Sequence, residues 1–362
     1  LAGVERRVLH ENLMEAYKKI SFVAEAEVNA VVRDNMINSD IRGYKTSYEA
    51  TVLQYQNDLK TVESLVDVVT KANPICHKFF ELKTKILNKI EGSTDTKLTV
   101  ADMATGISTS KKVRRDIPFE EAVSIIRNAF NETDPEFAEI FDGYVERGQI
   151  DVYPKQGKRS GAFCWSQVGA DRTFVFLNYT GKLDNLSTIA HEMGHAFHYD
   201  LSKSQPAIYR DFTTSVAEVA STFFENILFD KMLETADEDE KRDLLLNNVQ
   251  DRAMTIFGQI AYFQFEKKLH AAVREKGYVK KEEMAAMFAE ARRSYLGDAV
   301  EVSEDDGYAY VYIGHFRMFF YVYAYAYGQL IADALYAEYK KDKKFIEKIK
   351  KFPLFIFFSI LF

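Results

Sequence analysis

The sequence has 362 residues, of which 47% are hydrophobic and 28% are charged, so the chain can bury a large core and is not an intrinsically disordered protein. Its 54 acidic and 47 basic residues give a formal charge of −7, and the lack of a long block of one sign argues against a nucleic-acid partner. The two cysteines, Cys76 and Cys164, lie far apart without a CxxC pair, which argues against a disulfide framework or a cysteine-built zinc site and favours a cytoplasmic location.

Helical periodicity is the main pattern along the chain. Segment 149–180 differs, because QIDVYP, RSGAFCW and RTFVFLNY place β-branched and aromatic residues between Gly-rich turns, which predicts a small sheet. No internal repeat divides the chain, so we expect one mainly α-helical domain over 1–362, with a helical lobe over about 1–115 and a motif-bearing part over about 116–362. Apolar residues recur at helical spacing near 5–35, 44–70, 76–91, 119–130, 213–232, 239–276 and 281–295.

The two ends of the chain have unusual sequences. The chain begins LAGVERRVLHEN, without an initiator Met or a signal pattern, so we expect it to begin inside a longer gene product. The last eleven residues, Phe352 to Phe362, read FPLFIFFSILF, which is too short to span a bilayer. One interpretation is a core segment or a truncated or misread end, and the other is an anchor at a membrane interface. We favour the core segment or altered end and expect no membrane partner.

The segment TIAHEMGHAFH, residues 188–198, directly follows the predicted sheet. In a helix, His191 and His195 lie one turn apart on one face, so both imidazoles can bind one metal ion. Glu192 lies about 100° round the helix from His191, beside the metal, where it can accept a proton from a water molecule that the metal activates. The competing interpretation is a chance HExxH match in a helical scaffold.

Other residues of the same segment refine this prediction. Asp184 or Ser187 can cap the start of the helix, and Pro206 lies beyond its end. Gly194 costs about 1 kcal/mol relative to alanine in a helix interior, which indicates that another group approaches the backbone closely there. His198 lies on the face of His191 but about 10 Å along the axis, so it either supports the ligands from outside or simply packs.

A catalytic zinc site needs a third protein ligand. The metzincin pattern is absent, because His198 and Leu201 stand where it requires Gly and His. The predicted helix over 213–229 has two acids, Glu218 and Glu225, on one face among apolar residues, where a buried carboxylate needs a partner or a metal. Periodicity alone leaves the choice between them open.

These residues together resemble the oligoendopeptidase F branch of the thimet-oligopeptidase-like zinc peptidases. NYTGKLDNLSTIAHEMGHAFH resembles that family's approach strand, Thr-Gly turn and HExGHxxH helix, and SVAEVASTFFEN resembles its downstream Glu-x-x-Ser-x-x-x-Glu-Asn helix. RGYKTSYEA at 42–50 and GHFRMFFYVYAYAYG at 314–328 are also similar to family segments. The similarity covers most of the chain, but the family's N-terminal helical region is missing and the apolar tail differs from its C-terminal helices. We therefore expect a fragment.

The resemblance implies a mainly α-helical, zincin-type peptidase domain with a small β-sheet next to the HExxH helix. It implies one Zn²⁺ per chain, held by His191, His195 and Glu218, with Glu225 supporting the ligands from outside. It also implies that Glu192 acts as general base and then as general acid. The activity that follows is zinc-dependent endopeptidase hydrolysis, and the alternative is an inactive relative that binds peptide or zinc.

The resemblance also implies how substrate binds. The family encloses its site in a deep helical channel, so we expect short peptides rather than folded proteins as partners. The strand matching RSGAFCW borders the cleft, and Gly161, Ala162 and Phe163 are expected to pair with the substrate backbone as an added strand.

The aromatic run at 314–328 has two interpretations, because aromatic-rich helices are usually core. By the resemblance, His315 and Tyr321 polarise the substrate carbonyl and Tyr325 contacts the substrate. A regular helix would separate His315 from Tyr321 by about 240°. The chain between these two residues must therefore leave helical geometry or move when substrate binds.

Overall fold

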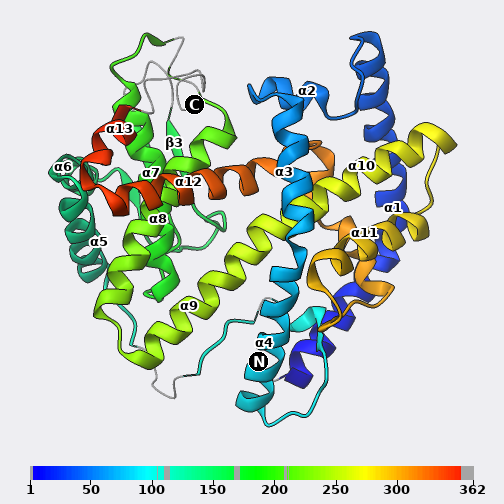
Figure 1. Ribbon diagram of the computed structural model, residues 1–362, viewed down its shortest axis with the longest axis horizontal. Helices are drawn as coiled ribbons and strands as arrows, with labels where there is room; N and C mark the ends of the chain where they lie inside the picture. Colours follow the sequence, from blue (N-terminus) through cyan, green and yellow to red (C-terminus); the bar gives the residue numbers. More distant parts are fainter. Residues whose placement is uncertain are drawn as a thin grey trace. The chain divides into compact units, whose positions relative to one another are not determined.

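In a computed structural model of the chain, the described residues are 3–103, 105–109, 115–166, 172–207, 210 and 212–351. The expected mainly α-helical fold with small sheets is confirmed (Figure 1). The chain divides into two compact units, the first formed by residues 1–110 and 239–327 and the second by 111–238 and 328–362. The apolar tail at 352–362 lies outside the described residues.

The first unit is built almost wholly from helices. A short parallel pair joins β1 (Leu98–Thr99) to β5 (Val300–Glu301), and a single π-helical turn, η3 (Met254–Gly258), connects two of the helices. The helices are α1 (Gly3–Ile41), α2 (Glu49–Gln54), α3 (Leu59–Lys71), α4 (Asn73–Glu91), α9 (Glu238–Ala253), α10 (Gln259–Lys276) and α11 (Lys281–Leu296), with 3₁₀ turns η1 (Val100–Asp102), η4 (Asp305–Val311) and η5 (Gly314–Arg317).

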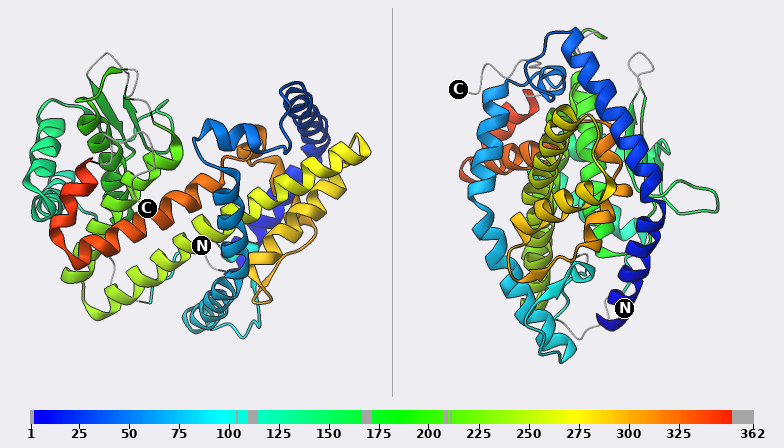
Figure 2. Two further views of the ribbon diagram at one scale, coloured as in Figure 1. Left: turned by 45° about the horizontal axis from the view of Figure 1, so that its top comes forward. Right: turned by 90° about the vertical axis from the view of Figure 1, so that its right-hand side faces the viewer.

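Residues 239–327 pack with the N-terminal helices, whereas we expected the helical lobe to end near residue 115. The reason is a shared core, in which Val28 and Val32 of α1 lie in one buried cluster with Leu269 of α10 and Phe288 of α11. Figure 2 shows α10 and α11 running side by side within this unit. The lobe is therefore made from two separate stretches of sequence.

Two of the helix predictions are corrected, one for a divided helix and one for a missed helix. The helix expected over 44–70 is broken between α2 and α3, where Gln56 has a φ of 56° and the Asp58 side chain accepts from the Thr61 N–H at 2.9 Å, a typical N-cap. A further helix, α6 (Pro135–Glu146), was missed. Its signal is present in the sequence, because Asp134 caps it by accepting from Glu136 N–H at 2.9 Å and Pro135 occupies its first turn.

The second unit contains the HExxH helix and the predicted sheet. The sheet has three strands in the order β2 (Ile150–Asp151), β4 (Thr173–Phe176), β3 (Phe163–Ser166), with β2 parallel and β3 antiparallel to β4, so β3 is at an edge. The helices of this unit are α5 (Phe119–Thr133), α6, α7 (Leu183–Ser202), α8 (Thr214–Thr235), most of α12 (Tyr323–Lys341), η6 (Lys343–Phe345) and α13 (Ile346–Lys351).

Phenylalanines fill the core beneath the HExxH helix. Phe197 of α7 lies 5.0 Å from Phe130 and 4.7 Å from Phe224, measured between ring centroids, and Phe137 lies 4.8 Å from Phe224. Such edge-to-face and tilted contacts are the favoured arrangements of buried aromatic rings. This core holds α7 against α8, and α7 also packs on β3 and β4.

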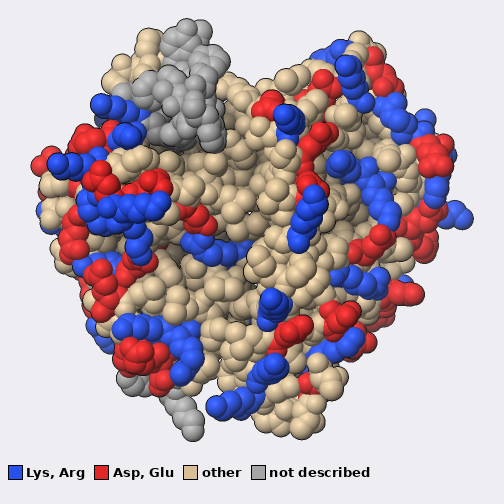
Figure 3. Space-filling model, viewed as in Figure 1, with Lys and Arg blue, Asp and Glu red and all other residues tan. Residues whose placement is uncertain are grey.

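The surface carries both signs of charge. Figure 3 shows Lys and Arg interspersed with Asp and Glu over the face in view, which agrees with the near balance of 54 acidic and 47 basic residues. Across the described ranges, the helices are all too short or too polar to cross a membrane.

Candidate metal centre

The HExxH helix α7 begins before both of its expected caps. Its N-cap is Lys182, not Asp184 or Ser187 as predicted. Asn185 stabilises the start, because its Oδ1 accepts from the backbone N–H of Thr180 at 2.8 Å and from that of Lys182 at 3.3 Å, which satisfies N–H groups that precede the first helical hydrogen bonds. The helix ends at Ser202, before Pro206 as expected.

Gly194 lies where the backbone of α8 approaches α7 closely. A Cβ atom at this position would lie 2.6 Å from Cα of Ser221 and 2.8 Å from the carbonyl oxygen of Ala220. These distances are too short for any side chain, so the close approach expected at Gly194 is present. The glycine thereby lets the backbone of α8 approach the histidine face of α7.

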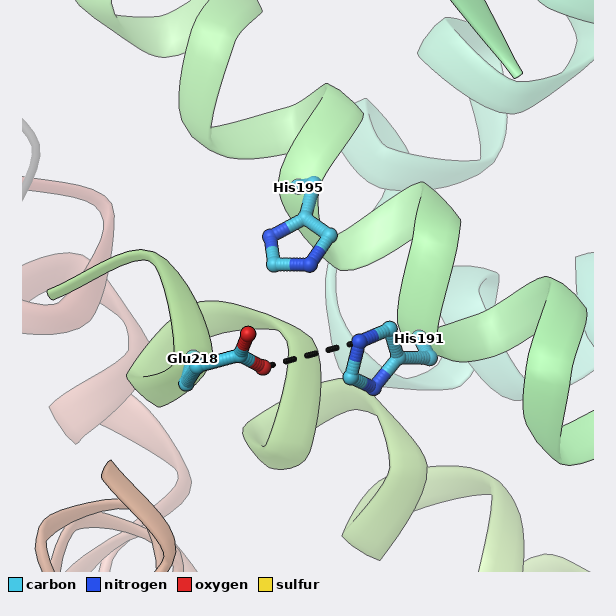
Figure 4. Close-up of side chains that lie close together, drawn as sticks. All are labelled: His191, His195 and Glu218. Atoms are coloured by element: carbon cyan, nitrogen blue, oxygen red, sulfur yellow. Dashed lines mark ion pairs between the residues drawn. The ribbon is translucent and has the colours of Figure 1, made fainter. Parts of the chain in front are cut away.

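Three side chains meet at this crossing. His191 and His195 come from α7 and Glu218 from α8, and Figure 4 shows them pointing toward one another. One ligand atom from each lies within 4.8 Å of the others, and Nε2 of His191 lies 3.6 Å from Oε2 of Glu218. The imidazole rings of the two histidines are 4.8 Å apart.

Each member of this cluster is held by a further contact. Glu225 pairs with Nδ1 of His191, which leaves Nε2 directed at the cluster. The His195 ring hydrogen-bonds to the backbone of Ala217, and Ser221 Oγ donates to Oε2 of Glu218 at 3.0 Å. Metal-bound histidines usually have such a carboxylate or carbonyl partner on the other nitrogen.

The two histidines differ in their affinity for a proton. Burial favours neutral His191, but the hydrogen bond with Glu225 and the charges of Glu225 and Glu218 outweigh it and raise the pKa to about 9. Burial, together with the charge of His191, lowers the pKa of His195 well below its usual value. A divalent cation would take the place of this proton in neutralising the two carboxylates.

Glu192 is the buried acid beside the cluster. The residue is 5% exposed, the backbone of Cys164 in β3 hydrogen-bonds to its carboxylate, and Oε2 has no partner among the described residues. Burial raises its pKa to about 7, although the charge of His191 opposes the shift. A carboxylate in this environment can accept and return a proton near neutral pH.

His198 is a packed residue. It is 2% exposed, its ring stacks on Phe212 with centroids 3.7 Å apart, and burial lowers its pKa to about 3. Of the two alternatives left open by the sequence, the packing role is the one that these contacts favour.

The donor set fits a zinc ion. Two imidazole nitrogens and one carboxylate oxygen are the ligands of many catalytic zinc sites, which leave a fourth position open. The side chains are partly exposed, 29% for His191 and 18% for Glu218, so part of the cluster is accessible to solvent. Gly328 of α12 also contributes, because a Cβ there would lie 2.8 Å from Cβ of Glu218. This glycine was not among the predicted site residues.

The segment predicted to bind substrate leads into the edge strand. Gly161 has a φ of +85° and precedes β3 with Ala162, whereas Phe163 is the first residue of β3 and is 38% exposed. The Phe163 ring stacks on Phe176 of β4 at 4.5 Å. An edge strand has unpaired backbone groups that can receive another strand.

The predicted oxyanion residues lie in the first unit and converge with one another. His315 Nδ1 and the Tyr321 hydroxyl hydrogen-bond, and Tyr325 lies 6.0 Å from His315 and 5.9 Å from Tyr321 between ring centroids. The chain does leave helical geometry between them, as required, because η5 ends at Arg317 and α12 begins at Tyr323. Their approach to the metal cluster stays a prediction.

Comparison with known proteins identifies relatives of this chain. The sequence pattern that defines peptidase family M3 matches residues 5–351. Oligopeptidase PepF of Bacillus subtilis is 26% identical over 346 residues, which are 94% of this chain and 50% of that protein. The chromosomal oligoendopeptidase F of Lactococcus lactis subsp. cremoris is 28% identical over 89% of this chain and 52% of its own length. The chain thus spans about half the length of the curated relatives it matches.

Solved structures share the fold. A putative peptidase from Chlamydophila abortus superimposes with a TM-score of 0.82 at 24% identity, covering 96% of this chain and 57% of that one. Oligoendopeptidase-F from Enterococcus faecium superimposes with a TM-score of 0.70 at 22% identity, covering 96% of this chain and 55% of that one.

Proposed function

The chain belongs to peptidase family M3, and on this premise we propose that it is a zinc-dependent metalloendopeptidase that hydrolyses short peptides. The observation that carries the proposal is the meeting of His191, His195 and Glu218, with ligand atoms within 4.8 Å of one another, next to the buried acid Glu192. An accidental HExxH in an unrelated scaffold is at odds with the family membership. The names of the relatives, oligopeptidase and oligoendopeptidase, support short peptides as substrates.

The proposed chemistry assigns each residue one task. His191, His195 and Glu218 would hold one Zn²⁺, which when bound acts as a Lewis acid toward water and the peptide carbonyl. Glu192 accepts the proton of the attacking water on its carboxylate and then donates it to the leaving amine. The hydrogen bond from the Cys164 backbone orients the Glu192 carboxylate for both transfers.

The edge strand β3 supplies a place for the substrate backbone. Because β3 pairs only with β4 among the strands of the described residues, a peptide can add as a further strand along Gly161, Ala162 and Phe163. The backbone contact between Cys164 and Glu192 puts the general base next to this strand. A peptide bond bound there would therefore lie close to the group that handles its protons.

His315 and Tyr321 are proposed to stabilise the developing oxyanion. Burial raises the pKa of Tyr321 and lowers that of His315, so at neutral pH the phenol stays protonated and the imidazole neutral. If Nδ1 of His315 donates to the Tyr321 oxygen, the phenol O–H can turn from its hydrogen bond with Tyr325 to donate to the substrate. Tyr325 would line the same surface.

Tyr321→Phe separates this role from a core role. We expect kcat to fall on the order of 10²–10³-fold with unchanged zinc content, because one oxyanion donor is removed. A tyrosine that only packs would cost about 1 kcal/mol of stability and leave kcat nearly intact. Peptide kinetics and thermal melts on Tyr321→Phe and Tyr325→Phe, made side by side, measure both. Normal kcat in both variants would mean that the tyrosines of segment 314–328 only pack in the core.

Metal removal tests the function as a whole. We expect about one Zn²⁺ per chain after mild purification and zinc supplementation, and cleavage of a quenched peptide library that stops with a zinc chelator and returns with added Zn²⁺. A protein that takes up no metal would contradict the zinc assignment. One bound Zn²⁺ without any cleavage would identify the alternative, a zinc-binding relative that lacks activity.

We also propose a cytoplasmic location, supported by the two free cysteines, Cys76 and Cys164. Reduced thiols are usual in that compartment. Fractionation of the source cells with an antibody to this chain would test it.

A further inference from the structure

The turn that precedes Tyr321 has an unusual backbone. Phe319 has a φ of 52° and Phe320 a φ of 59°, so two consecutive aromatic residues adopt the left-handed conformation. This conformation is sterically costly for residues with a Cβ and is rare for bulky ones. Such strained residues persist only where the surrounding structure holds them, and they cluster at functional sites.

The turn decides where Tyr321 points. It replaces the helical path between η5 and α12, and in doing so it brings the Tyr321 hydroxyl onto Nδ1 of His315. A continuous helix would rotate the second side chain by about 240° from the first, which leaves their directions about 120° apart. The left-handed turn at Phe319 and Phe320 therefore brings together Tyr321 and His315, the proposed oxyanion group.

Glu266 holds this turn from α10. Its Oε1 accepts from the backbone N–H of Phe320 at 2.8 Å, and the residue is 1% exposed. Phe320 itself is fully buried and lies 4.6 Å from His270 between ring centroids. A second bond runs from Thr51 Oγ1 to the carbonyl oxygen of Phe319 at 3.1 Å.

A glutamate is a costly residue at this position. Burial raises its pKa to about 8, with the Phe320 N–H opposing the shift, and its Oε2 has no partner within the described ranges. An apolar side chain would fill the same space without this desolvation cost. The contact that accounts for an acid here is the hydrogen bond that Glu266 accepts from the Phe320 N–H.

We propose that Glu266 is a positioning residue, whose bond to the Phe320 N–H keeps the left-handed turn in place and thereby holds Tyr321 against His315. The kinetic part of this inference rests on the proposed function of Tyr321. The structural part stands on the turn alone. No catalytic contact with substrate is assigned to Glu266.

Two variants of Glu266 test the bond. Glu266→Gln keeps a carbonyl acceptor of the same reach, whereas Glu266→Met keeps the length and removes the acceptor. Hydrogen exchange over 315–322 is expected to speed up in Glu266→Met and to stay near wild type in Glu266→Gln. The kcat of Glu266→Met is expected to fall on the order of 10²-fold, as displacement of a catalytic group does, with zinc content unchanged. Val273→Ala, a core truncation on the same helix, controls for loss of stability.

A double variant separates positioning from general destabilisation. In a Tyr321→Phe background, Glu266→Met should lower kcat no further, because both changes remove the same donor. Equal exchange over 315–322 in Glu266→Met and wild type would overturn the inference, as would a full additional loss of kcat in the double variant. A third outcome is faster exchange over 315–322 in Glu266→Met together with a normal kcat in Tyr321→Phe. It would support the positioning of the turn by Glu266 and refute the catalytic role of Tyr321.

Discussion

Glu192→Gln is expected to keep its zinc and to lose hydrolysis by about 10²–10⁴-fold, the usual contribution of a general base and acid. The amide cannot accept the proton of the attacking water. It still accepts a hydrogen bond through its carbonyl oxygen, so the contact with the Cys164 backbone and the three metal ligands are retained. Peptide kinetics beside elemental analysis of the same sample measure the two effects.

Asp184→Asn is a suitable control, because it makes the same chemical change in the first turn of the same helix at an exposed position. It should leave kcat and zinc content near wild type. Near-normal turnover in Glu192→Gln would mean that another group is the base. Loss of zinc in that variant would mean that Glu192 belongs to the ligand set.

Glu218→Ala and Glu225→Ala are expected to differ in zinc affinity. Removing Glu218 deletes a proposed ligand, so zinc should be lost or bound very weakly. Removing Glu225 deletes only the partner of Nδ1 of His191, and such outer partners usually cost about 10–100-fold in metal affinity. Zinc titration with a competing chelator of known affinity measures both constants.

The two variants control for each other, since they make the same truncation on one helix, seven residues apart. Thermal melts of the metal-free proteins should show whether either change destabilises the fold by itself. The reverse ranking in the titration would move the ligand from Glu218 to Glu225.

Local patterns in the sequence were sufficient for much of the fold. The alternation in 149–180 predicted a small sheet, which has three strands in the structure, and the apolar spacing predicted most helices, because both signals depend only on neighbouring residues. The missed helix α6 had a readable start at Asp134 and Pro135. Which segments form each unit could not be predicted, because the packing of α1 with α10 and α11 joins residues more than two hundred positions apart.

The sequence by itself determined the character of the site. The four-residue spacing of His191 and His195 puts two imidazoles on one face of any helix, and Glu192 between them is turned to the side. This part of the geometry is local, because the helical repeat alone produces it. The glycine at 194 likewise indicated a close neighbour without saying which one.

Only the tertiary structure decided how the two acids of α8 divide their contacts. Glu218 and Glu225 share a helical face, so periodicity treats them alike. The close approach of the α8 backbone at Gly194 fixes where along its length α8 crosses α7. This places Glu218 near Nε2 of His191 and Glu225 at Nδ1. The turn at Phe319 and Phe320 is a similar case. Nothing in two phenylalanines favours a left-handed backbone, and it forms because contacts distant in sequence, from Glu266 and Thr51, outweigh the local preference.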